Sequence, residues 1–341
     1  MNNVTTSLQL PSSRFFIFTN ALQLLTPLSL LLFLDLMNVL VSGGSGFIGS
    51  RLVGRLLQRQ HEVSVLTRAP ERVRDHLPAE VRLVHWNSGG SGHWEEAIHD
   101  ADAVVNLAGT SIASGRWTHK RKDLILYTRT DTTRSIVDAI GRASKKPKVL
   151  VNASAVGYYG NVPVGDVTEE HPSGDDFLSH VCKEWEEEAR KVERFGVRVV
   201  LPRTGIVLDK NGGALQRLLI PFRLFAGGPL GNGRQWFPWI HLGDVIGALI
   251  HAVEGSTLTG AVNLAAPESV TMKEFCSMLG KVMHRPSWAP VPGFVLKTVL
   301  GELAGPLLLS GQKAVPGKLV ASGYRFQFPE LKPALEDILR G

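Results

Sequence analysis

The fold is decided by the stretch Asn38-Val39-Leu40-Val41-Ser42-Gly43-Gly44-Ser45-Gly46-Phe47-Ile48-Gly49. An apolar strand runs directly into glycines at positions 43, 46 and 49, and a helical pattern follows. Glycine there allows a tight turn, close approach of the backbone to a pyrophosphate, and packing of the helix against its strand. The helix N-terminus then offers N–H groups and the positive end of its dipole to phosphate. The stretch therefore predicts a dinucleotide site over residues 43–49.

Beyond this stretch, short apolar runs alternate with amphipathic segments. Further strands are expected at 62–67, 81–86, 103–107, 148–154, 197–202 and 261–265, and helices at 47–58, 120–142, 176–195, 244–254 and 272–283. Strands separated by helices predict a parallel sheet covered on both faces. The predicted fold class is α/β, a Rossmann-type doubly wound parallel sheet with a smaller C-terminal, substrate-side helical module. Glycine and proline crowd residues 211–238, so we expect a loop-rich cap over the carboxyl edge of the sheet.

The chain divides into three expected parts: an N-terminal extension over residues 1–36, an NADP-binding domain over 37–285, and a small C-terminal module over 286–341. The extension contains one basic residue, Arg14, and one acidic residue, Asp35. Its apolar run contains Pro27 and is shorter than the roughly 20 residues of a spanning helix. A cleaved targeting peptide, a membrane-proximal anchor and sequence upstream of a true start at Met37 all stay open. We expect a cytoplasmic protein, or a plastid or other organellar one if the extension is a targeting segment, with no stable membrane span after residue 36.

Composition excludes several classes of protein. The 341 residues are 44% hydrophobic and 20% charged, which is typical of a globular chain. The net charge of +6 comes without a long Lys/Arg run, so nucleic-acid binding is not expected. The two cysteines, Cys182 and Cys276, supply neither a disulfide framework nor metal-ligand spacing, and no metal site is predicted.

The end of the second strand selects between NAD and NADP. An NAD-specific protein places Asp or Glu there, about 20 residues beyond the glycines, to bind the ribose hydroxyls. Here Thr67-Arg68 brings no carboxylate, and a guanidinium can bind a 2′-phosphate bidentately. The fourth strand closes with Asn106-Leu107-Ala108-Gly109, whose small residues leave room for a cofactor. NADP(H) is the predicted cofactor, with Arg129 as a further contact; the alternative for Arg68 is a solvated surface charge.

These motifs resemble the short-chain dehydrogenase/reductase superfamily, in its extended, nucleotide-sugar-epimerase-like division. The resemblance narrows at Asn152-Ala153-Ser154-Ala155-Val156-Gly157-Tyr158-Tyr159-Gly160, at Gln235-Trp236-Phe237-Pro238-Trp239-Ile240-His241, and in the tail over 311–316 and 324–329. From about Met37 to the end, the chain is similar to epimerase family proteins also described as SulA-like cell-division inhibitors or giant-chloroplast-type proteins. They join an epimerase/dehydratase domain to a short C-terminal domain of unknown function. The resemblance implies a fold and a cofactor but no settled substrate.

The resemblance also implies a catalytic set: a Ser or Thr after the fifth strand and a Tyr-x-x-x-Lys pair on the next helix. The lysine lowers the tyrosine's pKa and holds the nicotinamide ribose, and the tyrosine moves a proton. Ser154 matches the serine and Lys183 can match the lysine, but Ser179 stands where the tyrosine belongs. Tyr158 or Tyr159 is a candidate substitute. The alternatives are that both tyrosines line a pocket and that Lys183 is a surface residue.

An anionic substrate would call for cations, and Arg116, Arg129 and Arg203 are the candidates. Gln235, Trp236 and His241 are further substrate candidates, with ordinary salt bridges and aromatic packing as alternatives. Two functions follow. One is an NADP(H)-dependent oxidoreductase or epimerase-like enzyme acting on an unidentified small polar molecule; the other is an NADP(H)-binding regulatory or assembly protein with little turnover. A homodimer through helices 120–142 and 176–195 is expected only by analogy with relatives.

Overall fold

The central sheet of the computed structural model is parallel throughout, as predicted. The model describes residues 36–87, 92–255 and 257–340, so the interpretations of residues 1–35 lie outside the described residues. The strands are β1 (Asn38–Ser42), β2 (Glu62–Thr67), β3 (Arg82–His85), β4 (Ala103–Asn106), β5 (Val149–Asn152), β8 (Arg198–Thr204) and β12 (Gly260–Leu264). Their order across the sheet is β12-β8-β5-β4-β1-β2-β3, and the short β6 (Ser154–Ala155) also pairs with β8. The order reverses between β1 and β4, where doubly wound folds bind their ligands.

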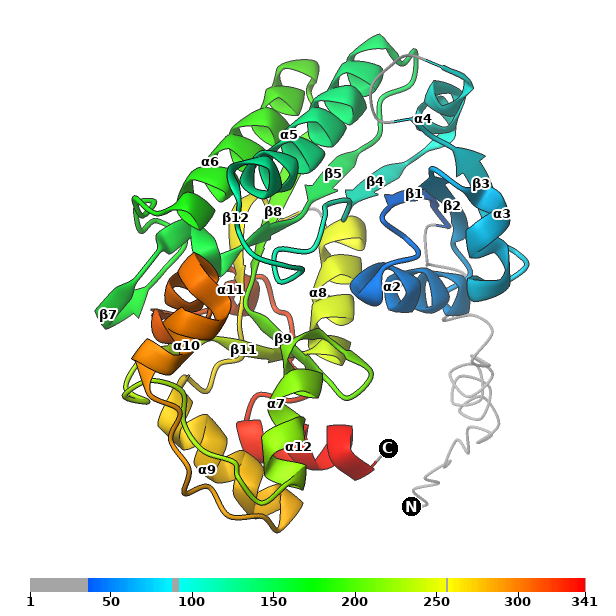
Figure 1. The fold of residues 1–341 in the computed structure, drawn as a ribbon. Coiled ribbons are helices and arrows are strands. Elements are labelled where there is room, and N and C mark those ends of the chain that lie inside the picture. The colour runs from blue at the N-terminus through cyan, green and yellow to red at the C-terminus, as the bar shows by residue number, and fades with distance from the viewer. Residues whose placement is uncertain (1–35, 88–91, 256, 341) are drawn as a thin grey trace, which may run out of the picture. The chain divides into compact units, whose positions relative to one another are not determined.

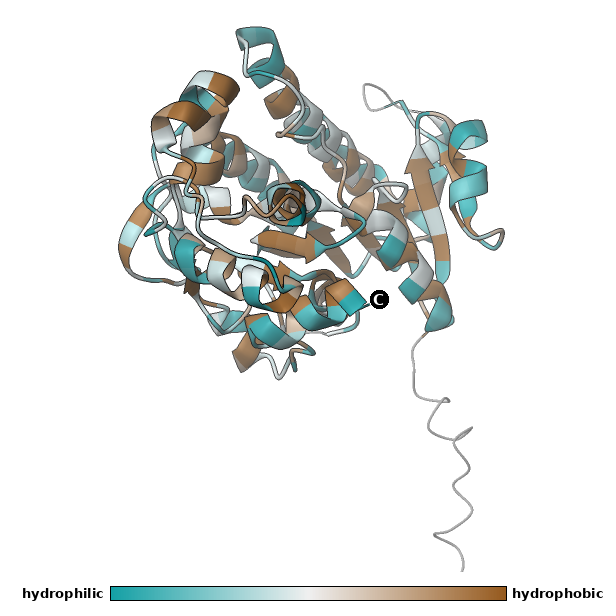
Figure 2. Cartoon of the chain, turned by 60° about the horizontal axis from the view of Figure 1, so that its bottom comes forward, coloured by the Kyte–Doolittle hydropathy of each residue, from teal (hydrophilic) through white to brown (hydrophobic). Residues whose placement is uncertain are grey.

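Helices cover both faces of this sheet (Figure 1). On one face, α2 (Phe47–Gln58) and α8 (Leu242–Glu254) form a core with β1, β2 and β4. On the other, α4 (Glu96–Asp100), α5 (His119–Arg142) and α6 (Phe177–Arg190) form a second core. Because both faces are covered, the strands are apolar on both sides, and Figure 2 shows them mostly in the hydrophobic colour.

The region expected to be a loop-rich cap contains regular structure. Residues 211–238 include α7 (Gly213–Arg223), which ends two residues after its internal Pro221, and β10 (Trp236–Phe237). Around them lie further strands in two-stranded pairs: β7 (Val162–Val167) with β14 (Gln312–Ala314), β9 (Ile206–Asp209) with β11 (Trp239–His241), and β10 with β13 (Val270–Thr271). Gly213 and Pro221 thus lie within α7, whereas the other glycines and Pro229 lie mostly in the connection over residues 224–235, which is as loop-rich as expected.

The C-terminal residues pack into the body of the molecule. Their elements are α10 (Gly293–Leu300), α11 (Gly317–Ala321) and α12 (Leu331–Arg340). A third core joins α7, α9 (Met272–Met283) and α12, and from Met37 onward the described residues form one compact unit. The boundary predicted at 285/286 falls between α9 and α10 within this unit. Within the described ranges, no helix has the length and apolarity needed to cross a bilayer.

Short helical turns complete the described chain. They are α3 (Pro70–Val73), η2 (Arg74–His76), η3 (His93–Glu95), η4 (Val156–Tyr159), η5 (Lys191–Phe195), η6 (Gly301–Leu303) and η7 (Gly305–Leu309).

A buried carboxylate in α8 holds the C-terminal segment in place. Asp244 is 0% exposed and accepts hydrogen bonds from the Tyr324 hydroxyl at 3.0 Å, the Gln327 N–H at 2.7 Å and the Phe328 N–H at 3.0 Å. The N-cap of α8 is not Asp244 but His241, whose Nδ1 accepts from the Gly243 N–H. Asp244 instead fixes the segment that leads into α12.

We predict that Asp244→Ala lowers the free energy of unfolding by about 3 kcal/mol, because it leaves several buried donors without an acceptor. Asp337→Ala is the control, since Asp337 is 55% exposed and has His241 as its only ion-pair partner among the described residues, and it should cost less than about 1 kcal/mol. Urea denaturation of both variants measures the difference. Equal losses in the two variants would show that Asp244 does not anchor the tail.

Candidate functional site

The turn between β1 and α2 presses against the end of β4. Gly43 has φ +72°, and a Cβ there would lie 2.8 Å from the Leu107 carbonyl carbon. A Cβ on Gly49 would lie 2.1 Å from the Gly43 carbonyl oxygen. Only glycine fits either position, so the backbone there forms a cradle with no side chain at positions 43 and 49, as close approach of a pyrophosphate requires.

The N-terminus of α2 is open to an anion. Its N-cap, Gly46, has no side chain to cap the helix, and the first turn contains no acidic residue. Ser45 and Gly46 are exposed, while Phe47 and Ile48 are half-buried at the start of the helix. The N–H groups and dipole of this turn therefore fit the phosphates of a dinucleotide.

Arg68 lies exposed directly after β2. Among the described residues, no carboxylate pairs with its guanidinium, whereas Arg74 nearby donates to the carbonyl oxygens of Ala79 and Val81. Thr67 accepts the Ala69 N–H at 3.3 Å and so shapes the turn that presents Arg68. A free guanidinium at the carboxyl end of β2 fits a 2′-phosphate on the adenosine ribose.

Asn106 supports the site from inside the protein. Its side chain is 0% exposed; Oδ1 accepts from the Ser42 hydroxyl at 2.5 Å, and Nδ2 donates to Asn152 Oδ1 at 2.7 Å and to Thr133 Oγ1 at 2.9 Å. These bonds tie β1, β4, β5 and α5 together at the carboxyl edge. Leu107, Ala108 and Gly109 continue from there along the surface where a cofactor would pass.

A buried ion pair organises the predicted catalytic region. Glu186 of α6 and Arg203 of β8 are each 3% exposed in their side chains and form two hydrogen bonds of 2.8 Å. Burial alone lowers the pKa of Arg203, but its bonds to the Glu186 carboxylate more than compensate and raise it. Arg203 also donates to the Tyr159 hydroxyl at 3.0 Å and to the Glu169 carbonyl oxygen at 3.1 Å. Its donors are used inside the protein, which does not fit the predicted role of holding a substrate.

The other predicted catalytic groups join the same network. The Ser154 hydroxyl donates to Glu186 Oε1 at 2.7 Å, and Ser154 is 5% exposed. The Tyr159 hydroxyl donates to Asn263 Oδ1 at 2.6 Å, and burial raises the pKa of Tyr159 to about 12. Tyr158 is half-buried, with its ring 3.4 Å from the Arg203 guanidinium carbon. Ser154 and Tyr159 are thus held in structural bonds, and of these three residues only Tyr158 is partly accessible.

The inward face of α6 carries neither lysine nor tyrosine. Lys183 is 53% exposed and lies 4.0 Å from Glu187 on the outer face, so it does not meet Ser154. The buried residues one and two turns before Glu186 are Cys182 and Leu178. Burial raises the pKa of the Cys182 thiol to about 12, so it stays protonated at neutral pH. Ser179, at the expected tyrosine position, donates to the Gly157 carbonyl oxygen and to Asp176.

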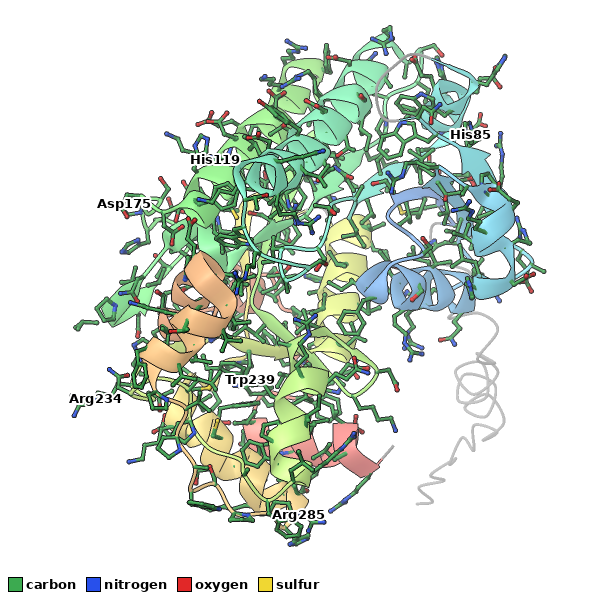
Figure 3. The ribbon with its side chains drawn as sticks, in the orientation of Figure 1. His85, His119, Asp175, Arg234, Trp239 and Arg285 are labelled. Carbon is green, nitrogen blue, oxygen red and sulfur yellow. The ribbon has the colours of Figure 1, made fainter. Side chains whose placement is uncertain are left out.

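The segment over residues 235–241, which contains Trp236 and Trp239, supports the C-terminal residues. Gln235 donates to the carbonyl oxygens of Leu230 and Leu308, and Trp236 donates to the Pro163 carbonyl oxygen. His241 lies between Gly243 and Asp337, and burial lowers its pKa. Trp239, labelled in Figure 3, is 1% exposed. The structure uses the predicted substrate residues of this segment for packing and connection.

Sequence reasoning missed Glu186, Cys182 and Arg121. Glu186 follows Cys182 by four residues, so both fall on one face of the helix, and a carboxylate on an apolar face was the available signal for it. Arg121 lies on α5 near Arg129, and both approach the segment after β4. Arg116 lies exposed in that segment, with no ion pair in the described part of the chain.

Comparison with known proteins places this site in a family. The model of the NAD dependent epimerase/dehydratase family matches residues 39–265, and a domain of unknown function, DUF1731, matches residues 291–338. The chain is 42% identical to the chloroplastic homolog of epimerase family protein SDR39U1 from Arabidopsis thaliana, covering 89% of this chain and 87% of that protein. It is 40% identical to epimerase family protein YfhF of Bacillus subtilis, covering 89% and 98%.

Solved structures agree with this assignment. The crystal structure of human epimerase family protein SDR39U1 (isoform 2) with NADPH has a TM-score of 0.79 and 38% identity, covering 89% of this chain and 99% of that one. The UDP-glucuronic acid 4-epimerase of Bacillus cereus has a TM-score of 0.72 at 18% identity, covering 89% and 98%, which is a likeness of fold alone. The chain therefore belongs to the NAD dependent epimerase/dehydratase family, as an extended short-chain dehydrogenase/reductase-type protein with a C-terminal DUF1731 domain.

Proposed function

We propose that this chain is an NADP(H)-binding oxidoreductase whose preference for NADP(H) over NAD(H) comes from Arg68. The observation that carries the proposal is the free guanidinium of Arg68 at the end of β2, where an NAD-specific site would hold a carboxylate. The glycine turn and the N-terminus of α2 would hold the pyrophosphate. The human relative crystallised with NADPH, 38% identical to this chain, supports the same cofactor.

The chain's own residues position the cofactor in this proposal. The Asn106 network holds the ends of β1, β4 and β5 in register, and the glycine cradle brings the backbone close to the phosphates. The bound nicotinamide would supply or accept a hydride. Given the order of the sheet, the adenosine half would lie over β2 and the nicotinamide half beside β4 and β5.

We predict that Arg68→Glu reverses the cofactor preference. The new carboxylate would repel the 2′-phosphate and accept ribose hydroxyls, so NADPH affinity should fall about 100-fold while NADH affinity holds or improves. Isothermal titration with both cofactors measures the change. Arg55→Glu is the matched control, because Arg55 is an exposed arginine of α2 whose side chain, within the described ranges, bonds only to Gln58, and it should leave both affinities within about twofold. An unchanged NADPH affinity in Arg68→Glu would contradict the proposal.

A second candidate function is NADP(H) binding with little or no turnover. The observation that favours it is the inward face of α6, where Cys182 and Leu178 stand one and two turns from Glu186 and neither can move a proton at neutral pH. The Ser154 hydroxyl donates a hydrogen bond to Glu186 and is not free to polarise a substrate oxygen. An enzyme built on this site would take its proton from Tyr158 or from solvent.

We predict that Lys183→Ala leaves NADPH affinity within about twofold of the parent chain, because an exposed lysine paired with Glu187 contributes little. Gly49→Val is the opposing control and should abolish binding, since its side chain would occupy the place of the Gly43 carbonyl. Fluorescence titration with NADPH measures the affinity of both variants. A tenfold loss in Lys183→Ala would place that lysine on the cofactor, as the resemblance first implied.

A further inference from the structure

Two arginines on the inner face of α5 approach the segment that follows β4. Arg129 donates from Nη1 to the Ile125 carbonyl oxygen at 2.9 Å, and a Cβ on Gly109 would lie 3.2 Å from its Cζ. Its guanidinium carbon is 5.1 Å from the centre of the Trp185 ring. The side chain is therefore wedged between α6 and the end of β4, at the edge where the nicotinamide half would lie.

Arg121 stands two turns earlier on the same helix, shortly after His119, which Figure 3 labels. Its Nη2 donates to the Ser111 carbonyl oxygen, and its Nε is buried without a hydrogen-bond partner in the described part of the protein. Arg121 thus contacts Ser111 and Arg129 lies against Gly109, so both guanidiniums approach the same short segment after β4. Burial lowers the pKa of Arg129; the Cys182 thiol opposes this effect, and the positive charge of Arg121 adds to it.

Several other cations of α5, unlike Arg121 and Arg129, form ion pairs with carboxylates. Lys122 pairs with Glu302 at 2.5 Å, Arg134 with Asp131 at 3.1 Å, and Arg142 with Glu95 at 3.0 Å. Arg121 and Arg129 have only main-chain oxygens as acceptors among the described residues, and so does Arg217 of α7, which reaches the Ala113 carbonyl oxygen at 3.4 Å. Cations in a partly buried site are costly without an opposite charge.

We infer that Arg121 and Arg129 form a binding site, here called the seat, for an oxyanion carried by the substrate. The oxyanion is a phosphate or a carboxylate. This inference rests on the proposed function and names the class of substrate: a small anionic molecule bound beside the nicotinamide. Each guanidinium presents fork-like donors that match the oxygens of these groups. The N-terminus of α5 adds the positive end of its dipole on the same side.

The cofactor's own pyrophosphate is the other source of such an anion. The position of Arg129 argues for the substrate, because the glycine cradle belongs to the turn between β1 and α2, whereas Arg129 lies on α5 against Gly109 and the Trp185 ring of α6. The pyrophosphate already has the α2 N-terminus. A group seated by Arg121 and Arg129 therefore lies past the phosphates along the cofactor.

The test uses the full chain saturated with NADPH and titrated calorimetrically with inorganic phosphate. We expect phosphate to bind the complex, and Arg121→Gln and Arg129→Gln each to weaken that binding about tenfold, the loss expected for one charge-assisted contact. Arg134→Gln is the control on the same helix and should leave it unchanged, because Arg134 is paired with Asp131 and Glu188. Absence of phosphate binding, or equal binding in all variants, would overturn the inference.

A second arm separates the two sources of anion. If the seat serves the substrate, both glutamine variants keep NADPH and NADH affinity within about threefold. If both affinities fall about tenfold together and phosphate does not bind the NADPH complex, the seat belongs to the cofactor and the substrate assignment is wrong. Should NADPH fail to bind the parent chain, the proposed function fails, while phosphate binding to the free protein still tests the seat.

Thermal unfolding shows whether each variant is folded. Removing one of two neighbouring unpaired guanidiniums relieves repulsion, so the melting temperatures of Arg121→Gln and Arg129→Gln should equal or exceed that of the parent chain. Phosphate should raise the melting temperature of the parent chain and of Arg134→Gln only. A lower melting temperature in both seat variants, without loss of phosphate protection, would assign the arginines a structural role instead.

Discussion

The ion pair between Glu186 and Arg203 is the constraint on which the predicted catalytic region depends. Two charges that are each 3% exposed stay ionised only while they hold each other and their remaining hydrogen bonds. The pair fixes α6 against β8 and so determines which side of that helix faces the interior. With Glu186 turned inward, Cys182 and Leu178 follow it and Lys183 lies outside. The ion pair also engages Ser154 and Tyr159, whose hydroxyls then serve the framework.

The site consequently has two halves of different character. The half that would hold the adenosine and phosphates keeps what cofactor binding needs, namely the glycine cradle, an uncapped helix N-terminus and a free cation at Arg68. The half beside β4 and β5 lacks the tyrosine and lysine of the usual chemistry and brings arginines from α5 instead. Cofactor binding and catalysis are therefore separate questions in this protein, and anionic ligands are the chemistry that the second half suits.

The fold followed closely from the sequence because local signals mark it. Residues 47–58, 62–67 and 272–283 carry clear periodicity bounded by glycine, threonine or histidine, and the structure has α2, β2 and α9 over these ranges. Strands β9, β11 and β14 escaped prediction because they are short and pair with partners remote in the chain. The orientation of α6 could not be predicted for a related reason. Neighbouring residues on a helix point about 100° apart, so Cys182 and Lys183 cannot both face the interior. The contact that turns Cys182 inward, between Glu186 and Arg203, joins two separate elements.

A crystal structure of the full chain grown with NADPH tests the central claim most directly. The account predicts the 2′-phosphate against Arg68, the pyrophosphate against residues 43–49 and the N-terminus of α2, and the nicotinamide beside the ends of β4 and β5, with Lys183 remaining on the surface. A cofactor whose 2′-phosphate lies away from Arg68, or crystals that stay free of cofactor at millimolar NADPH, would contradict it.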